Sequence, residues 1–263
     1  MDWHSMSQLG SKFESLVKII EKLRSPEGCP WDMEQTSKSL VPYFIEEVHE
    51  VIEAIDSKNS SALKEELGDV FLHVIFQALI AEEKKEFMVQ DVFDGVSKKL
   101  INRHPHVFGN DKVTESNQAN QNWEKAKHQE KQRESRLDGI PLSLPSTLQA
   151  QRLQQKASYA GFDWKNSKDV WKKINEELNE LKNAEKERNI DHIENELGDL
   201  LFSIINLARF LDISADNALR STNKKFKNRF YFIEKTLNES GKNIEDCSLK
   251  ELNNIWKKAK TKE

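Results

Sequence analysis

One acidic motif occurs twice in this chain of 263 residues, each time at the start of an apolar segment. The first copy begins EELGDVFLHVI at Glu65, and the second begins NELGDLLFSII at Asn195. Apolar residues then recur every three or four positions: Leu67, Val70, Phe71 and Val74 in the first copy, and Leu197, Leu200, Leu201 and Ile204 in the second. This spacing is typical of an amphipathic helix. Each motif therefore predicts a long helix with one apolar face.

A second helical segment precedes each motif. The segments read PYFIEEVHEVIEAI and VWKKINEELNELKNA, and both carry an apolar stripe beside an ExxE pair of glutamates. If the two helices of a unit pack antiparallel along their stripes, the acidic residues of both helices converge at the edge of the interface. The basic structural unit is therefore expected to be a pair of helices.

The distances between matching residues show that the unit is duplicated. Four acidic pairs are each 130 residues apart: Glu47 and Glu177, Glu50 and Glu180, Glu66 and Glu196, and Asp69 and Asp199. Lys99 and Lys225 are 126 apart, as are Arg103 and Arg229, and two pairs of tryptophans are 133 apart. Generic amphipathicity does not reproduce so many distinctive residues at nearly one offset, so this is an internal repeat.

We therefore predict an all-α fold of two tandem helical-bundle repeats, which also agrees with the scarcity of glycine and proline, 9 and 6 residues. The first repeat is expected over 1–109, a polar linker over 110–142, and the second repeat over 143–263. Trp123 lies within the linker and suggests that part of it docks.

Charge and hydropathy exclude several classes of protein. The net charge of −4 gives no general basic character for binding a nucleic acid polymer. No apolar run approaches the length of about 20 residues that spans a bilayer, and the first residues do not resemble a signal peptide. The two cysteines form neither a CxxC pair nor a disulfide framework. We expect a soluble, cytoplasmic protein without a membrane or nucleic acid partner.

The duplicated carboxylates predict a metal site. Residues three apart lie on one side of a helix, and four converging carboxylates repel one another unless a divalent cation lies between them. Oxygen ligands without cysteine or histidine favour Mg²⁺, with Mn²⁺ as a substitute. The predicted ligands in the second repeat are Glu177, Glu180, Glu196 and Asp199, and a second possible site consists of Glu47, Glu50, Glu66 and Asp69. The alternative is a solvated acidic helix face, which is the usual explanation of an isolated ExxE pair.

A glycine separates the two acids of each motif, although a glycine inside a helix costs about 1 kcal/mol relative to alanine. Gly68 and Gly198 would let a partner helix or a ligand phosphate approach closely. Tight helix packing alone is the simpler explanation.

Basic residues downstream of each acidic motif could bind phosphates. Lys225 and Arg229 are four residues apart on one helix face, as are Lys99 and Arg103. We take Lys173, Lys225, Arg229, Trp256 and Arg103 as candidates for nucleotide binding. The alternatives are a solvated basic face and, for Trp256, a cap on the core.

The combined motifs resemble the MazG nucleoside triphosphate pyrophosphohydrolases of the all-α NTP pyrophosphatase superfamily. The similarity rests on EEVHE with EELGD and EELNE with NELGD, and on CPWD, RHPHVF, GFDW and KFKNRF. It extends over nearly the whole chain and indicates the two-repeat form of the family.

This resemblance implies Mg²⁺-dependent hydrolysis of nucleoside triphosphates, with broad specificity for NTPs and dNTPs, to the monophosphate and diphosphate. It further implies a homodimer, and a second repeat that is the catalytic one, with metal ligands at Glu177, Glu180, Glu196 and Asp199. Lys225 and Arg229 would bind phosphates, with Trp256 near the base. Two other functions stay open: a phosphohydrolase that releases orthophosphate stepwise, and a helical module whose acidic faces bind a basic partner.

Overall fold

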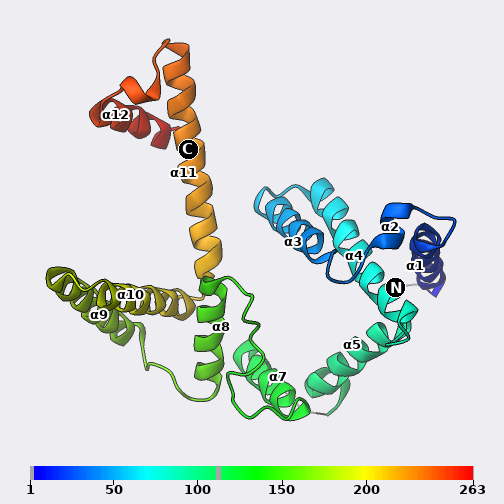
Figure 1. The fold of residues 1–263 in the computed structure, drawn as a ribbon. Helices are drawn as coiled ribbons and strands as arrows, with labels where there is room; N and C mark the ends of the chain where they lie inside the picture. The colour runs from blue at the N-terminus through cyan, green and yellow to red at the C-terminus, as the bar shows by residue number, and fades with distance from the viewer. Residues whose placement is uncertain (1–2, 111–113, 263) are drawn as a thin grey trace. The chain divides into compact units, whose positions relative to one another are not determined.

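The computed structural model describes residues 3–110 and 114–262, and over these residues the regular structure is helical, without a strand (Figure 1). This confirms the prediction of an all-α fold. Contacts between residues divide the chain into two compact units, Met1–Val113 and Thr114–Glu263. Among the described residues, no helix combines the length and the apolar character needed to cross a membrane.

The first unit contains six helices within its described residues: α1 (Trp3–Arg24), α2 (Pro30–Glu34), α3 (Val41–Asp56), α4 (Ser60–Glu83), α5 (Val89–Arg103) and α6 (Pro105–Phe108). Its core lies where the second half of α4 meets α1. Ile20 of α1, Leu40 before α3, and Ile75 and Ile80 of α4 are almost fully buried there. Helices α3 and α4 lie side by side as a hairpin.

The second unit contains α7 (Ser116–Glu130), α8 (Ser146–Tyr159), α9 (Ser167–Glu187), α10 (Ile190–Phe210), α11 (Ala215–Glu239), a 3-10 turn (Ile244–Asp246) and α12 (Leu249–Lys260). Helices α9 and α10 form the hairpin that matches α3 and α4, and their core contains Val170, Ile174 and Leu207. Helix α7 lies in the stretch predicted as a linker. It contacts α8 of the second unit through Glu124, which pairs with Arg152 and Lys156.

Repeated N-terminal caps fix where the second helix of each hairpin begins. The Asn59 side chain accepts hydrogen bonds from the backbone N–H groups of Ser61 and Ala62, each 3.2 Å long. The Asn189 side chain accepts one of 3.2 Å from the N–H of His192. Each asparagine precedes the glutamate of its ELGD motif by seven residues. Because a cap sets the first turn of a helix, it also sets which side of α4 and α10 the acidic residues occupy.

The apolar stripes are less covered than the sequence predicts. We expected the partner helix of each hairpin to bury them, yet Leu197, Leu201 and Ile204 of α10 are 45, 52 and 45% exposed. Leu67 and Phe71 of α4 are also exposed. The expectation was wrong at these positions because the apolar stripe is wider than the surface that one partner helix covers.

A nearly buried arginine connects α1 to α4 in the first unit. The guanidinium of Arg24 donates two hydrogen bonds of 2.7 Å to the Glu83 carboxylate, and its side chain is only 5% exposed. It also donates to the carbonyl oxygens of Asp32 at 2.7 Å and Gln35 at 3.2 Å. These hydrogen bonds hold the pKa of Glu83 below its usual value. The same arginine therefore anchors α4 and the turn that leads from α2 to α3.

We expect Arg24→Ala to lower the free energy of unfolding of the first unit by about 2 kcal/mol, because buried charge-assisted hydrogen bonds are lost. Urea denaturation followed by circular dichroism would measure this loss. The matched control is Lys22→Ala, which removes an exposed ion pair with Glu27 and should cost less than about 0.5 kcal/mol. Equal effects of the two substitutions would contradict the anchoring role.

Candidate metal centre

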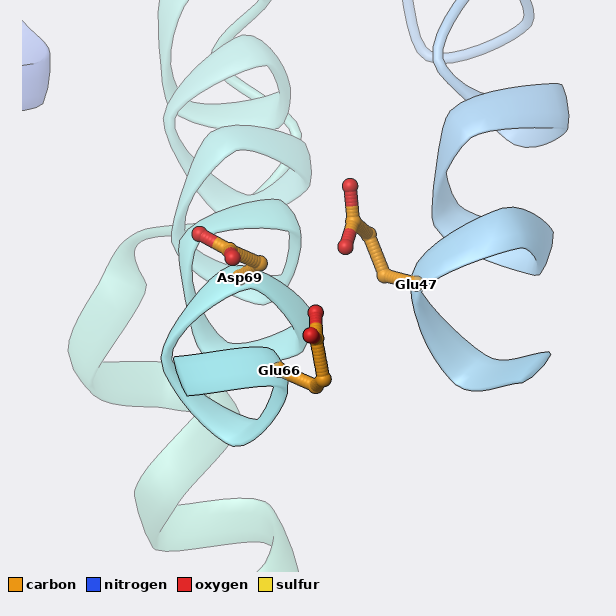
Figure 2. Close-up of side chains that lie close together, drawn as sticks. All are labelled: Glu47, Glu66 and Asp69. Carbon is orange, nitrogen blue, oxygen red and sulfur yellow. The ribbon is translucent and has the colours of Figure 1, made fainter. Parts of the chain in front are cut away.

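The first hairpin brings three of its four acidic residues together. Figure 2 shows Glu47 reaching from α3 toward Glu66 and Asp69 of α4. One carboxylate oxygen from each of the three residues lies within 4.8 Å of the others. The fourth predicted residue, Glu50, is close enough to hydrogen bond to both Glu47 and Glu66. The structure therefore places all four predicted residues in one acidic cluster.

Crowding changes the ionisation of this first cluster. Desolvation, followed by the negative charge of Asp69 and contact with Glu50, raises the pKa of Glu47 above its usual value. The pKa of Glu66 is raised by desolvation and then by the charges of Glu50, Glu65 and Asp69. Both shifts reflect the partial desolvation of the carboxyl groups first and the neighbouring negative charges second.

The second hairpin forms the equivalent cluster. Carboxylate oxygens of Glu177, Glu196 and Asp199 lie within 4.8 Å of one another. Glu177 is 4% exposed, whereas Asp199 lies at the surface. A hydrogen bond that the protonated carboxyl group of Glu180 donates to Glu177 is the largest cause of a raised pKa at Glu180, followed by desolvation and the charges of Glu177 and Glu196. All four predicted residues of the second repeat therefore meet at the open edge of α9 and α10.

Two residues distinguish the second cluster from the first. The Lys173 ammonium lies 2.5 Å from Glu177 and 2.7 Å from Glu176, and these contacts raise the pKa of Lys173. The Nε2 atom of His192 lies 3.2 Å from a carboxylate oxygen of Glu196. The residues 130 positions earlier are Tyr43 and Ala62. The second cluster therefore has a lysine and a histidine at two positions where the first cluster has a tyrosine and an alanine.

His192 was missed by reasoning from the sequence, although one signal for it was present. It stands four residues before Glu196, and residues four apart share a helix face. Its other ring nitrogen lies 3.0 Å from the carboxylate of Glu187. Comparing the two repeats position by position would have singled it out, because its counterpart is an alanine.

The glycines of the two ELGD motifs face open space. A Cβ built on Gly68 or Gly198 would meet no atom within 4 Å outside its own helix backbone. Tight packing between helices of the same chain therefore does not explain these glycines. The space beside each glycine stays free for a ligand or for another molecule.

Three of the other candidate residues, Lys225, Arg229 and Trp256, lie on α11 and α12, and the fourth, Arg103, lies in the first unit. The Arg229 guanidinium of α11 lies over the Trp256 ring of α12 at 5.4 Å, and Phe226 packs against the same ring at 5.2 Å. Lys225 stands four residues before Arg229 on α11. Arg103 ends α5 and is 6% exposed, so it is a buried residue of the first unit rather than the open basic clamp we expected.

A pocket opens next to the second cluster. It is lined by Trp164, Lys172 and Lys173 together with Glu176 and neighbouring residues, and its volume is about 480 Å³. Ligand pockets for small molecules span about 300–1000 Å³. Lys173 therefore joins an acidic cluster to a pocket large enough for a nucleotide.

The raised pKa of Glu180 predicts a pH-dependent stability in protein kept free of divalent cations. A carboxyl group whose pKa is higher in the folded than in the unfolded state favours folding below its unfolded pKa, and this contribution is lost as pH rises through the folded pKa. Glu180→Gln should therefore raise the melting temperature near neutral pH and flatten its dependence on pH. Thermal melts in a chelator from about pH 4, close to the ordinary pKa of a glutamate, to about pH 8 would measure the effect. Glu185→Gln removes a carboxylate of α9 outside the cluster and should leave the pH profile unchanged.

The open space at Gly198 predicts a stabilising substitution. Gly198→Ala should raise the free energy of unfolding by about 1 kcal/mol, because alanine favours a helix interior and its Cβ meets no neighbour. Gly28→Ala is the contrasting variant, since its Cβ would overlap the carbonyl oxygen of Leu23, and it should destabilise the first unit. Chemical denaturation of both variants checks the difference, and a destabilised Gly198→Ala would contradict the open space.

Comparison with known proteins agrees with this geometry. A family model described as the MazG nucleotide pyrophosphohydrolase domain matches the chain twice, over residues 35–108 and 165–230. Each match contains one of the two acidic hairpins. The duplication inferred from the sequence offsets is thereby confirmed.

Full-length relatives extend the similarity beyond the two hairpins. The chain is 48% identical to the nucleoside triphosphate pyrophosphohydrolase/pyrophosphatase MazG of Thermotoga maritima, over 97% of this chain and 98% of the relative. It is 37% identical to a nucleoside triphosphate pyrophosphohydrolase of Escherichia coli, over 96% and 98% of the two chains. A protein of Bacillus subtilis called YabN is 43% identical, and there the match covers 96% of this chain but 52% of the relative. This chain therefore belongs to the MazG nucleotide pyrophosphohydrolase family.

Proposed function

We propose that this protein hydrolyses nucleoside triphosphates to the monophosphate and diphosphate at the α9–α10 cluster, using Mg²⁺. The observation that carries this proposal is the convergence of Glu177, Glu196 and Asp199, with ligand atoms within 4.8 Å of one another. The names of the Thermotoga and Escherichia relatives support the same reaction. We expect both NTPs and dNTPs to be substrates.

The donor set fits a hard divalent cation. All the converging atoms are carboxylate oxygens, which Mg²⁺ and Mn²⁺ prefer over the sulfur and imidazole ligands of softer metals. The raised pKa of Glu180 shows that the protein alone does not neutralise the cluster. Glu177, Glu196 and Asp199 would hold the ion, and Glu180 would complete its ligand set. When bound, Mg²⁺ neutralises charge on phosphate oxygens and makes water more acidic.

The side chains around the cluster would position the substrate. Lys173 lies between the acidic residues and the pocket that contains Trp164, so its ammonium can bind a phosphate oxygen at the border. Glu177 is buried and held by Lys173, which fixes the direction of its carboxylate. A fixed carboxylate is suited to orient the attacking water or accept its proton. The α-phosphorus would then be attacked in line, with diphosphate leaving.

We place the active site in the second unit rather than the first. The acidic clusters are alike, but Tyr43 occupies the position of Lys173, so the first cluster has no equivalent ammonium beside it. A polyphosphate chain brings several negative charges, and a site without a nearby cation binds it less well. The first cluster remains a candidate for a second metal site of Glu47, Glu50, Glu66 and Asp69.

We further propose that the active protein is a homodimer. The apolar residues Leu197, Leu201 and Ile204 of α10 are about half exposed, and a contiguous apolar face of this kind is typical of an interface. A second copy could also supply Lys225, Arg229 and Trp256 to the site, since these residues form a group of their own on α11 and α12. Analytical ultracentrifugation would measure the oligomeric state, and a monomer at micromolar concentration would contradict this part of the proposal.

Removing a ligand should abolish the reaction without unfolding the protein. We expect Glu180→Ala and Asp199→Ala to reduce Mg²⁺-dependent release of diphosphate by at least about 100-fold, as metal-ligand substitutions commonly do, while helical content is retained. The assay supplies mixed NTPs with Mg²⁺ or Mn²⁺ and quantifies monophosphate, diphosphate and orthophosphate.

The matched controls are Glu50→Ala and Asp69→Ala, which alter the equivalent residues of the first cluster. If the second unit is the active one, these variants should keep most of the activity. Full activity in Glu180→Ala and Asp199→Ala would contradict the site. Orthophosphate as the first product would favour a stepwise phosphohydrolase, and independence of divalent cations would favour a protein-binding module.

A further inference from the structure

The pocket beside the second cluster extends along one face of α9. The helix contributes four lining residues at the three- and four-residue spacing of a single face, namely Asp169, Lys172, Lys173 and Glu176. From the first to the last of these, α9 rises by about 10 Å. The segment before the helix contributes Trp164 to the wall near the N-terminus of α9. The pocket therefore leads from Trp164 to Lys173, whose ammonium contacts the acidic cluster.

An ion pair with α10 anchors the residue before Trp164. The Arg209 guanidinium donates to both carboxylate oxygens of Asp163, and the arginine side chain is 14% exposed. One of these oxygens also accepts a hydrogen bond of 2.8 Å from the backbone N–H of Trp164. Arg209 is held in turn by a hydrogen bond of 3.0 Å to the side chain of Asn206. Asp163 therefore connects the backbone of Trp164 to α10.

The segment that contains Trp164 is also fixed at both of its ends. Before it, the backbone N–H of Phe162 donates to the carbonyl oxygen of Ala157 in α8 at 3.0 Å. After it, the Asn166 side chain accepts hydrogen bonds from the first turn of α9, at 3.0 and 3.2 Å. Contacts with three helices thus hold Trp164 at a defined place without a ligand, and such preorganisation lowers the entropy cost of binding.

The indole ring of Trp164 is accessible to a ligand. The residue is 44% exposed, and within the part of the chain that the structure describes, no aromatic ring packs on this indole and no cation lies over it. Trp256 differs, because both Phe226 and Arg229 contact its ring. Trp164 therefore presents a large aromatic surface to the pocket without an aromatic or cationic partner from the described protein.

The acidic groups at this end of the pocket are already neutralised within the protein. Asp163 is paired with α10, and Asp169 pairs with Lys172 at 3.0 Å. Lys165, which also lines the pocket, is exposed to solvent. A flat, uncharged ring needs no counter-ion here, whereas a phosphate chain would compete for cations that are in use. The Trp164 end of the pocket is therefore suited to a nucleoside, and the end beside the cluster to phosphates.

We propose that the Trp164 ring stacks on the nucleobase of the substrate and that Asp163 and Arg209 position it. This inference rests on the proposed function, because it assigns a place to the nucleoside of the triphosphate that the α9–α10 cluster would cleave. Each base has a flat π face, so stacking on an aromatic side chain tolerates every base. Trp164 therefore holds the nucleoside without selecting one base, which agrees with the broad specificity expected for NTPs and dNTPs.

The experiment compares two ligands of the full-length protein in Mg²⁺ by calorimetric titration. The first, α,β-methylene-ATP, has a nucleoside and a phosphate chain that the proposed reaction cannot cleave. The second, inorganic tripolyphosphate, has the chain alone. We expect Trp164→Ala to weaken binding of the ATP analogue by about tenfold, because base stacking is lost, and to leave binding of tripolyphosphate unchanged. Trp164→Phe keeps an aromatic ring and should retain most of the affinity.

Arg209→Ala tests the positioning role. This variant should weaken binding of the ATP analogue in the same selective way, because Asp163 loses the partner that holds it. In steady-state hydrolysis of ATP, both Trp164→Ala and Arg209→Ala should raise KM with little change in kcat, as the loss of uniform binding does. If Arg209→Ala fails to fold, as circular dichroism would show, Asp163→Asn removes the same ion pair at almost constant size.

Trp31→Ala is the matched control, because Trp31 stands 133 residues earlier in the first repeat and is 51% exposed. It should bind both ligands as the unaltered protein does. Unchanged affinity of Trp164→Ala for the ATP analogue would overturn the inference. An equal loss for tripolyphosphate would also overturn it, as would a selective loss in Trp256→Ala and none in Trp164→Ala.

These outcomes leave the proposed function intact. The proposed function fails in a different way, if the unaltered protein releases no diphosphate from ATP in Mg²⁺, and the role of Trp164 would then be overturned with it.

Discussion

Repulsion between carboxylates across a pair of helices is the constraint that both acidic clusters of this protein share. In each hairpin, an ExxE pair on one helix faces an ExxD pair on the next, and carboxylate oxygens from three residues come within 4.8 Å of one another. The hairpin tolerates this because its apolar residues pack farther along the helices, at Ile174 and Leu207 in the second unit. The repulsion is the physical reason to expect a cation, since a divalent ion converts it into attraction.

The acidic hairpins of the two units share one architecture but differ in the residues beside the carboxylates. Lys173 gives the second cluster a fixed positive charge directly beside Glu177, whereas the first unit has Tyr43 at that position. Tyr43 instead packs edge-on against Trp31, with ring centroids 5.9 Å apart. The two repeats therefore share the acidic residues and differ at a neighbouring position. Under the proposed function, this difference would let the second copy act on a phosphate chain and leave the first free for a different role.

The second unit contains a local group of cations that the net charge of the chain does not reveal. The net charge of the chain is −4, yet Lys156, Arg152 and Lys127 surround a single glutamate between α7 and α8. The region is polar and was expected as a linker over 110–142 of which part docks, and α7 docks on α8 through Glu124. Docking brings together cations that are distant in the sequence. The local charge of this region therefore differs from what the net charge of the chain indicates.

The sequence alone determined the helical class, the duplication and the eight acidic residues, because helical period, constant offsets and residue type are all local properties. It also led to the expectation that the acids lie on facing helices, since both helices of a unit carry an apolar stripe beside their acidic pair. Only the tertiary structure decided what surrounds them. It showed that Gly68 and Gly198 face open space and that Arg103 is buried. These facts depend on which side chains from separate elements meet, and no periodicity in one segment encodes that.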